Sequence, residues 1–484
     1  MSRKPARKMN GKKKGLLVGI ALFAVLYLAV IAWHTFKPLP AGLSYAGELR
    51  EAETVEMIAD LSFAQDEKGT DLQHELRIFE EVYGVIDRAE EFIVLDFFLF
   101  DHYGMEGKEY PAIAETLTAR LVDKKEQKPD MPIYFITDPL NTGYGSYDSP
   151  HLAELEQAGI EVIYTDLDKL RDSFPLYSGL YRLFFQWPYN PGEWGVSNPM
   201  AKDAPDMTLP SYLTMLNIKA NHRKAVITES EAIVSSANPH NASGFHGNMA
   251  FKVSGPVLND MLEAEEAVSL FSGGPELPRT DSKAQEGPYR VQYLTEQQTL
   301  KSLLGDIETA EKGNEIWLGM YFLAKRDIIG ALEGAADRGA DVRIILDPNK
   351  NAFGREKSGL PNRPVVHEIM EDSSDNLQVR WYNTVVGQYH TKTIMIRTDD
   401  RTVISGGSSN YTERTLDDYN VESNLRIEAP NDSELVRSME AYFTRLWNNE
   451  DALYTLEAEA YQSDLTFLQR GVYGVQKLLK FTTY

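Results

Sequence analysis

The chain has 484 residues, of which 43% are hydrophobic and 25% are charged, and its formal net charge at pH 7 is −23. This length exceeds that of one ordinary hydrophobic core and predicts two to three domains, with two as the simplest number. A body this acidic repels polyanions, so nucleic acid is not expected as a partner. The chain contains no cysteine, which excludes disulfides, thiolate metal sites and a cysteine nucleophile.

The N-terminal region combines positive charge with one long apolar run. Residues 1–14 hold seven lysines and arginines and no acidic residue, and residues 15–33 carry no charge. About 20 apolar residues cross a bilayer as a helix, so we predict a basic cytoplasmic tail over 1–14 and a transmembrane helix over 15–36. The positive-inside rule then places the large domain outside the cytoplasm of a single-pass cell-membrane protein. A cleaved signal peptide is the alternative, because "SYA" before Gly47 offers a cleavage site.

The rest of the chain contains two copies of one strand-helix-strand pattern, which is typical of α/β domains. The first copy reads EFIVLDFFLF, PAIAETLTARLVDK and PIYFITDP, and the second reads NEIWLGMYFL, DIIGALEGAADRG and DVRIILDP. We therefore predict a first α/β domain over 45–272, a linker rich in Gly and Pro over 273–288, and a second, similar α/β domain over 289–450. Such a duplication predicts a pseudo-twofold axis between the two domains.

The first half carries an extra segment. The aspartate that ends the third element is followed by a histidine after 84 positions in the first half (Asp138 to His222) and after 43 in the second (Asp347 to His390). Within the longer stretch, residues 174–194 gather eight aromatic side chains, which suit a membrane headgroup boundary or an acyl-binding wall, or else a loop packed over the domain. Residues 451–484 are predicted to form an amphipathic helical tail, either at the membrane interface or docked on the protein.

Each half ends in a His-x-Lys segment, "HRKAVITESEAIVSSAN" at 222–238 and "HTKTIMIRTDDRTVISGGSSN" at 390–410. Residues two apart in a strand share a face, so each histidine points the same way as its lysine. A hairpin then returns the small polar residues to the same end of the strand. The candidate site residues are therefore two histidines, two lysines, two asparagines and two serines: His222, His390, Lys224, Lys392, Asn238, Asn410, Ser236 and Ser408.

Two such sets facing each other suit one tetrahedral anion and indicate a phosphodiester site. One neutral imidazole can attack phosphorus to form a phosphohistidine, while the other, as imidazolium, protonates the departing alkoxide. Lysines and amides can neutralise the non-bridging oxygens, so we expect neither a metal nor another cofactor. The nearby His240 and His246 are expected to be solvated loop residues, and no Cys/His cluster indicates a structural zinc.

The two segments resemble the paired HKD motifs of the phospholipase D superfamily, His-x-Lys-x4-Asp followed by Gly-Ser-x-Asn. The similarity spans most of residues 75–450 and is strongest to membrane-anchored bacterial proteins of the cardiolipin synthase type. It implies a pair of α/β domains with the site at their interface and a phosphohistidine intermediate. One of His222 and His390 would be the nucleophile, with His222 favoured as the first-motif histidine, and the other would be the acid. The phosphate would be bound by Lys224, Lys392, Asn238, Asn410, Ser236 and Ser408. The resemblance also implies that Glu422 orients a catalytic histidine, whereas Ala250 occupies the matching first-half position at equal spacing.

The motifs depart from the family pattern at the aspartate. Glu229 stands there in the first half and Arg397 in the second, and Ser235 replaces the first glycine of Gly-Ser-x-Asn. In the family this acid mostly supports the fold, so the chemistry is expected to survive.

The resemblance implies phosphatidyl transfer, specifically cardiolipin synthesis from phosphatidylglycerol. The alternatives are a phospholipase D-type hydrolase of phospholipids and a non-catalytic membrane protein that binds anionic lipid. The sequence leaves the oligomeric state open.

Overall fold

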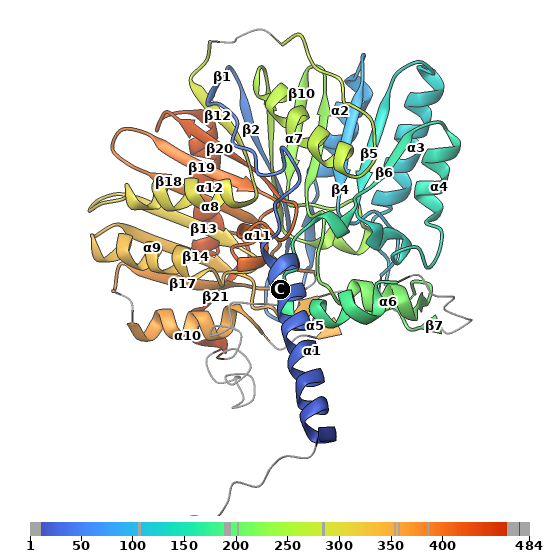
Figure 1. Cartoon of the computed structure of the whole chain (residues 1–484). Coiled ribbons are helices and arrows are strands. Elements are labelled where there is room, and N and C mark those ends of the chain that lie inside the picture. Colours follow the sequence, from blue (N-terminus) through green and yellow to red (C-terminus); the bar gives the residue numbers. More distant parts are fainter. Residues whose placement is uncertain are drawn as a thin grey trace, which may run out of the picture.

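The computed structural model describes residues 11–104, 108–187, 195–200, 203–282, 286–352, 355–356, 359–372, 374–385, 387–461 and 474. Within them the chain forms two large sheets, each covered by helices, which define a first and a second lobe (Figure 1).

The first lobe is built on an eight-stranded sheet of order β3-β2-β11-β10-β9-β4-β5-β6, in which β4, β5 and β6 are parallel. Strands β4 and β9 are buried along their whole length, as expected for central strands with covered faces. The strands are β2 (Val55–Phe63), β3 (Gln73–Glu75), β4 (Ile93–Phe97), β5 (Ile133–Thr137), β6 (Glu161–Tyr164), β9 (Lys224–Thr228), β10 (Glu231–Ser235) and β11 (Asn248–Ser254). The helices are α2 (Ile78–Arg88), α3 (Ile113–Gln127), α4 (Pro150–Gln157), α5 (Pro175–Leu180), α6 (Leu209–Met215) and α7 (Val257–Phe271), with short turns η1 (Pro139–Thr142), η2 (Leu167–Lys169), η3 (Tyr181–Phe185) and η4 (Asn241–Phe245) and a small hairpin of β7 (Gly195–Val196) and β8 (Met207–Thr208).

The second lobe is built on a nine-stranded sheet of order β1-β12-β20-β19-β18-β13-β14-β17-β21. Its strands are β1 (Arg50–Ala52), β12 (Tyr289–Thr295), β13 (Glu315–Met320), β14 (Asp341–Leu346), β17 (Leu377–Tyr382), β18 (Lys392–Arg397), β19 (Thr402–Gly407), β20 (Ser423–Ala429) and β21 (Thr455–Glu457). The remaining elements are α8 (Glu296–Glu308), α9 (Arg326–Asp337), α10 (Asn362–Asp372), α11 (Glu413–Leu416), α12 (Glu434–Asn448), η5 (Ala458–Tyr461) and a hairpin of β15 (Asn351–Ala352) and β16 (Arg355–Glu356).

The two lobes repeat one topology. The order β2-β11-β10-β9-β4-β5-β6 in the first sheet corresponds strand by strand to β12-β20-β19-β18-β13-β14-β17 in the second. In each lobe the strand after the His-x-Lys histidine, β9 or β18, runs antiparallel to the first strand of the α/β unit, β4 or β13. The predicted fold of two similar α/β domains is confirmed.

Three predicted boundaries are wrong in detail. Strand β1, inside the predicted first domain (45–272), pairs with β12 and belongs to the second sheet. Strand β21, inside the predicted helical tail (451–484), pairs with β17 at the other edge of that sheet. Both strands have three residues, and partners distant in sequence set their register, so no local periodicity reveals them. Residues 11–14, predicted as tail, begin helix α1, and 462–484, except 474, lie outside the described residues.

One hydrophobic core crosses the boundary between the lobes. It contains Val234 and Phe251 from the first sheet together with Met395 and Ile404 from the second. At Gly406 on β19, an added Cβ would lie 2.5 Å from the Phe251 ring, so glycine permits the close approach of the two sheets. The shared core fixes the relative position of the two motifs.

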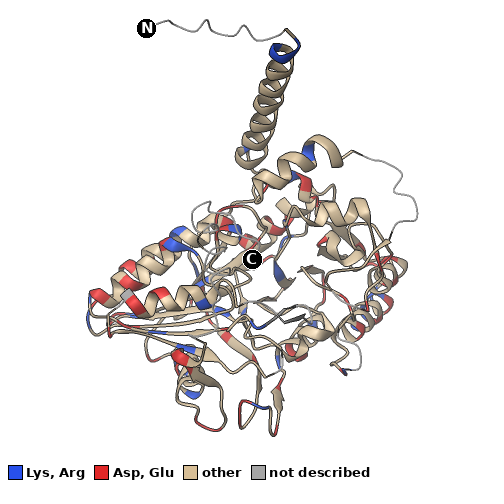
Figure 2. Ribbon diagram, turned by 90° about the horizontal axis from the view of Figure 1, so that it is seen from below, with Lys and Arg blue, Asp and Glu red and all other residues tan. Residues whose placement is uncertain are grey.

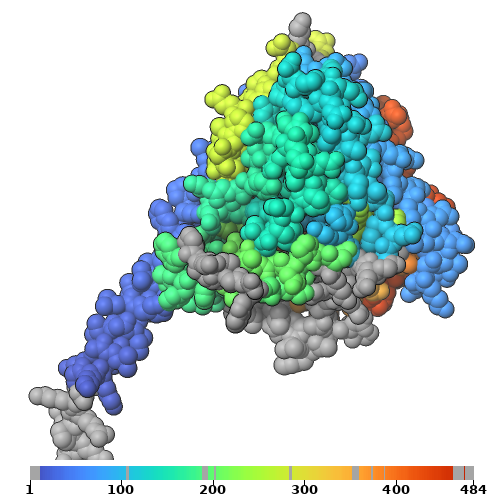
Figure 3. All heavy atoms as spheres, turned by 90° about the vertical axis from the view of Figure 1, so that its right-hand side faces the viewer, coloured from blue at the N-terminus to red at the C-terminus, as the bar shows by residue number. Residues whose placement is uncertain are grey.

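Helix α1 (Gly11–Phe36) projects from the body and carries no charge between its two ends (Figure 2). Among the described residues it is the one helix long and apolar enough to cross a membrane, and its apolar window is not buried in the protein. It could therefore span a membrane, as the sequence predicts. Its body-proximal half packs along α5 and η3, and Figure 3 shows it leaving the body beside the green surface of this region.

Candidate active site

The two His-x-Lys segments adopt the same local structure. Each lysine is the first residue of its strand and lies in the core, and its Nζ atom donates a hydrogen bond to the carbonyl oxygen of its own histidine at 2.6 Å in both lobes. Lys224 lies 5.2 Å from the centre of the Phe98 ring, and Lys392 lies 5.3 Å from the centre of the Tyr321 ring. The same rings contact His222 and His390. The strand pattern therefore places each histidine and lysine together, as predicted.

Each histidine is held by the backbone of the opposite lobe. The His222 amide donates to the Val421 carbonyl at 2.7 Å, and the His390 amide donates to the Gly247 carbonyl at 2.7 Å. The next residue along the chain also contacts the same histidine. The Glu422 side chain reaches the His222 ring, and the Asn248 side chain reaches the His390 ring. This reciprocal crossing brings both histidines to the interface between the lobes.

The side-chain partners of the two histidines differ in charge. His222 Nδ1 lies 2.9 Å from Glu422 Oε2, and His390 Nδ1 lies 3.1 Å from Asn248 Oδ1. Both partners are acceptors, so each Nδ1 carries the proton and each Nε2 keeps a lone pair. Asn248 was not predicted from the sequence. Glu422 lies 12 residues after Asn410, and the same spacing after Asn238 points to Ala250. The first-lobe loop is two residues shorter, which moves the matching position to 248.

The two motif serines form hydrogen bonds with these histidine partners, Glu422 and Asn248. Ser408 Oγ donates to Glu422 Oε2 at 2.6 Å, and Ser236 Oγ donates to Asn248 Oδ1 at 3.0 Å. Each hydroxyl oxygen also accepts a backbone amide, from Ser423 or Met249. The family resemblance implies phosphate binding for both serines, but each hydroxyl donates its single proton to Glu422 or Asn248. This arrangement suits a positioning role.

The two motif asparagines, Asn238 and Asn410, each lie two residues after the motif serine of the same lobe. Asn238 Oδ1 accepts the Leu99 amide at 3.4 Å, while Asn410 Oδ1 is buried without a hydrogen-bond partner among the described residues. Their contact with phosphate remains a proposal.

Two buried aspartates fix the residue before each histidine. Asp138 accepts the Asn221 amide at 2.8 Å, and Asp347 accepts the Tyr389 amide at 2.7 Å. Each also accepts an amide within its own turn, from Leu140 or Asn349. Burial raises the pKa of both carboxyls to about 7. They hold the start of each motif rather than supply a reacting group.

The two departures from the family aspartate have structural roles. Glu229 accepts the backbone amides of Glu90 and Glu91 at 3.0 and 3.2 Å and so closes the turn before β4. Arg397 pairs with Glu440 of α12. Both positions are at the far end of the strand from the histidine, so neither departure touches the reacting groups.

Two further residues belong to the site and escaped prediction. The Nε atom of Arg414 is buried without a hydrogen-bond partner among the described residues, and Glu422 and Tyr144 lie near enough to influence the pKa of this guanidinium. The ring of His246 lies 5.8 Å from that of His390, so this residue is not a solvated loop histidine. Arg414 lies four residues after Asn410, and this position relative to Ser-x-Asn was the available signal for it.

The site concentrates basic side chains within an acidic protein. Burial lowers the pKa of Lys224 to about 7 and that of Lys392 well below its ordinary value, and the nearby Lys224 adds to the shift of Lys392. Burial also lowers the pKa of His222 to about 4 although Glu422 opposes the shift, and it lowers the pKa of His390 further below its usual range. For Glu422, burial alone would raise the pKa, but His222 and Lys224 hold it below its ordinary value. Both histidines are therefore neutral in the free protein, and His222 faces an ionised Glu422.

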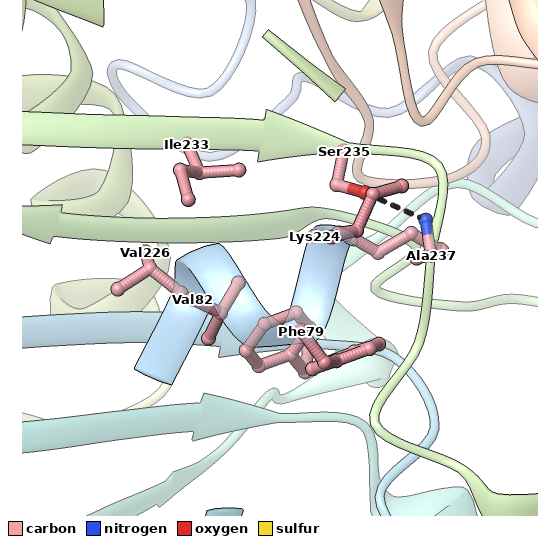
Figure 4. Close-up of a pocket in the computed structure, with 9 residues that line it drawn as sticks. Phe79, Val82, Lys224, Val226, Ile233, Ser235 and Ala237 are labelled. Atoms are coloured by element: carbon pink, nitrogen blue, oxygen red, sulfur yellow. Dashed lines mark hydrogen bonds between the residues drawn. The ribbon is translucent and has the colours of Figure 1, made fainter. Parts of the chain in front are cut away.

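The wall behind Lys224 is apolar. Figure 4 shows a narrow pocket in which Phe79 and Val82 of α2 face Val226 and Ile233, and Ser235 accepts the Ala237 amide. Water is excluded on this side of Lys224. The positive charge of the lysine is therefore stabilised mainly by an anion on its opposite side.

Comparison with known proteins agrees with this geometry. A family model described as "Cardiolipin synthase, PLD-like domain" matches residues 303–447, which lie in the second lobe. No curated protein matches the sequence. Among solved structures, phosphatidylserine synthase from Haemophilus influenzae Rd KW20 has a similar fold, with a TM-score of 0.55, 12% identity, and coverage of 90% of this chain and 94% of that one. The phospholipase D family member Nuc from Salmonella typhimurium has a TM-score of 0.27 at 22% identity and covers 33% of this chain and 95% of its own. The second lobe therefore matches a phospholipase D-like domain, and the chain as a whole shares the fold of phosphatidylserine synthase.

Proposed function

We propose that the protein is a membrane-anchored phosphatidyltransferase that makes cardiolipin from two molecules of phosphatidylglycerol. The observation that carries the proposal is the pair of interface histidines, one held by a carboxylate and the other by a carboxamide. This arrangement gives the two imidazoles different tasks on one phosphodiester.

In the first step, His222 Nε2 attacks the phosphorus of phosphatidylglycerol, and a nitrogen-phosphorus bond forms as the bond to the glycerol oxygen breaks. His390, protonated in the complex, gives its Nε2 proton to this oxygen, and glycerol leaves. In the second step, neutral His390 takes the proton from a glycerol hydroxyl of another phosphatidylglycerol. That oxygen attacks phosphorus, the nitrogen-phosphorus bond breaks, and His222 is restored.

The carboxylate supports His222 as the nucleophile. Attack places positive charge on its imidazole, and Glu422 stabilises that charge at 2.9 Å. His390 has a neutral partner, so its protonated form is stabilised only when the phosphate anion enters the cleft. It then releases the proton readily to the departing oxygen.

Lys224, Lys392, Asn238, Asn410 and Arg414 are the proposed phosphate ligands. The lysines are fixed to the histidine carbonyls, and the Arg414 Nε–H group has no hydrogen-bond partner among the described residues and can donate to phosphate. Preorganised donors of this kind stabilise the charge that develops on the phosphate oxygens.

We propose that α1 spans the membrane with its basic end in the cytoplasm, which places the catalytic lobes outside. The body end of α1 is fixed rigidly: the Asp172 amide donates to the His34 carbonyl at 2.9 Å, and Lys37 Nζ donates to the Asp168 carbonyl at 2.6 Å. Arg182 pairs with both Asp168 and Asp172. A fixed helix end holds the active site at a constant height above the lipid.

The extra first-lobe segment provides a second contact with the bilayer. At Gly179 of α5 an added Cβ would meet Tyr27 and Ile31 of α1 within 2.7 Å, so glycine allows the two helices to touch. Five apolar side chains of this segment are between 40% and 62% exposed: Leu176, Leu180, Phe184, Phe185 and Trp187. This aromatic and aliphatic surface continues that of α1, so we place it in the outer leaflet. Tyr189 and Trp194 of the predicted aromatic segment lie outside the described residues.

Product analysis tests the proposal. Purified full-length protein in detergent with phosphatidylglycerol should yield cardiolipin and glycerol in equal amounts. Phosphatidic acid as the sole lipid product would instead establish the hydrolase. Phosphatidylglycerol that binds but stays intact, alone and with other phospholipids, would establish a lipid-binding protein.

A further inference from the structure

A cluster of metal-ligating side chains lies in the first lobe, among residues that the reaction above does not use. His102 follows β4, Glu115 lies in the first turn of α3, and His151 lies in the first turn of α4. One ligand atom from each of the three lies within 4.8 Å of the others. Helices α3 and α4 run side by side at the edge of the lobe (Figure 1), so the cluster joins two helices and a loop.

The hydrogen bonds around His151 fix its tautomer. Thr118 Oγ1 gives its single proton to the Ala114 carbonyl at 2.8 Å, so it can only accept from His151 Nδ1, 3.2 Å away. Nδ1 therefore carries the proton and Nε2 has a free lone pair. This lone pair faces His102 Nδ1 at 3.0 Å. Zinc-bound histidines usually donate their second ring N–H to an oxygen, as His151 does here.

The distances and exposure suit a small divalent cation. Two ligands about 2.0 Å from a tetrahedral zinc lie roughly 3.3 Å apart, close to the separation of the two histidine nitrogens. His151 is buried, whereas His102 and Glu115 are exposed, so an ion can enter from solvent.

We propose that the protein binds one zinc-class divalent cation through His102, Glu115 and His151. Two imidazoles and one carboxylate form a ligand set that zinc accepts, with a fourth position left for water. This site departs from our expectation of no metal, which the sequence suggested because the three ligands are separated by 13 and 36 positions and form no spacing motif.

The cation would stabilise the catalytic loop. Asn241 of η4 donates to both Glu115 oxygens at 3.1 and 2.8 Å and accepts the Ala114 amide at 2.9 Å. The segment around Asn241 connects Asn238 to Asn248, the partner of His390. A cation on Glu115 would thus tie α3, α4 and this loop together without taking part in the chemistry.

Calorimetric titration of the chelator-treated full-length protein with zinc chloride tests this proposal. Wild type should bind one zinc, and His102→Ala, at an exposed position, should lose at least about 100-fold in affinity. Thr118→Val removes the acceptor for His151 Nδ1 with little change in shape and should cost about 10- to 100-fold. Zinc should raise the melting temperature of wild type and leave that of His102→Ala unchanged.

Two control variants locate the zinc. His367→Ala changes a histidine of α10 that pairs with Glu371, and His246→Ala changes the third histidine of the active site. Both should bind zinc like wild type. The proposal is overturned if wild type takes up no zinc, if His102→Ala binds as tightly as wild type, or if His246→Ala loses the zinc. In the first case the two histidines simply share a hydrogen bond.

Discussion

The two lobes share one topology but provide their histidines with different surroundings. In each lobe a lysine contacts its histidine's carbonyl, an aspartate holds the preceding residue, and a serine supports the side chain of the same lobe that contacts the other lobe's histidine. The supported side chain is Glu422 for His222 and Asn248 for His390. Duplication thus supplies the frame, and in the proposed mechanism one carboxylate in place of a carboxamide distinguishes the nucleophile from the acid.

The largest expected effect comes from the histidines themselves. His222→Ala and His390→Ala should each lower kcat on phosphatidylglycerol by at least about 1,000-fold, since each removes a group that makes or breaks a bond. A substrate with p-nitrophenol as the leaving group needs no acid, so His390→Ala should release p-nitrophenol in a burst, and His222→Ala should not. A burst from His222→Ala alone would reverse the assignment.

The partners of the histidines should come next. Glu422→Gln keeps the size and removes the charge, and we expect a loss of about 100-fold or more in kcat because the positive phosphohistidine loses its counter-ion. Asn248→Asp should raise the pKa of His390 and make it a weaker acid, which moves the alkaline limb of the pH profile of kcat upwards. Equal effects of the two changes on both limbs would show that the lobes are functionally equivalent.

Arg414 has no counterpart in the first lobe, where Ala242 follows Asn238 at the same spacing. Arg414→Gln should raise KM for phosphatidylglycerol about tenfold or more, since hydrogen bonds to charged groups contribute about 1.5–3 kcal/mol. Arg397→Ala is the matched control, because this arginine pairs with Glu440 away from the cleft. Steady-state kinetics of the two variants should therefore differ in KM.

Asp138 and Asp347 test whether the shared frame is equivalent in the two lobes. Burial raises the pKa of each carboxyl to about 7 from 3.8, so the folded protein binds more protons than the unfolded chain between these values. Their contribution therefore lowers the free energy of unfolding as pH rises from about 4 to 7. Asp347→Asn should flatten this slope and cost about 1–3 kcal/mol, because an amide N–H₂ would face a backbone donor. Denaturant unfolding across this pH range measures both effects, and Asp138→Asn should match them.

The smallest effect concerns the segment that only the first lobe possesses. Because the chain has no cysteine, Phe184→Cys and Leu270→Cys each create a single labelling site at an exposed apolar position, beside α1 and on α7 respectively. In nanodiscs, a nitroxide at 184 should be accessible to oxygen and shielded from a water-soluble nickel complex, and one at 270 should show the opposite. Similar exposure of both labels to the nickel complex would show that α5 and η3 do not lie in the membrane.

The sequence was sufficient where the fold is local and repeated. Two strand-helix-strand units and the His-x-Lys pairs follow from period and spacing, and the family resemblance implies that Glu422 lies beside a histidine. The structure places these features as expected. It was insufficient where the other lobe decides the outcome. Asn248, His246 and the engaged hydroxyl of Ser236 depend on a loop whose length differs between the copies, and β1 and β21 depend on partners far along the chain.

Direct identification of the covalent intermediate tests the central claim. Wild-type protein mixed with phosphatidylglycerol is quenched in alkaline denaturant, where phosphohistidine survives, and its peptides are mapped by mass spectrometry. The account predicts a phosphoryl adduct on His222 that Glu422→Gln diminishes and His222→Ala removes. An adduct on His390, or turnover without any histidine adduct, would contradict it.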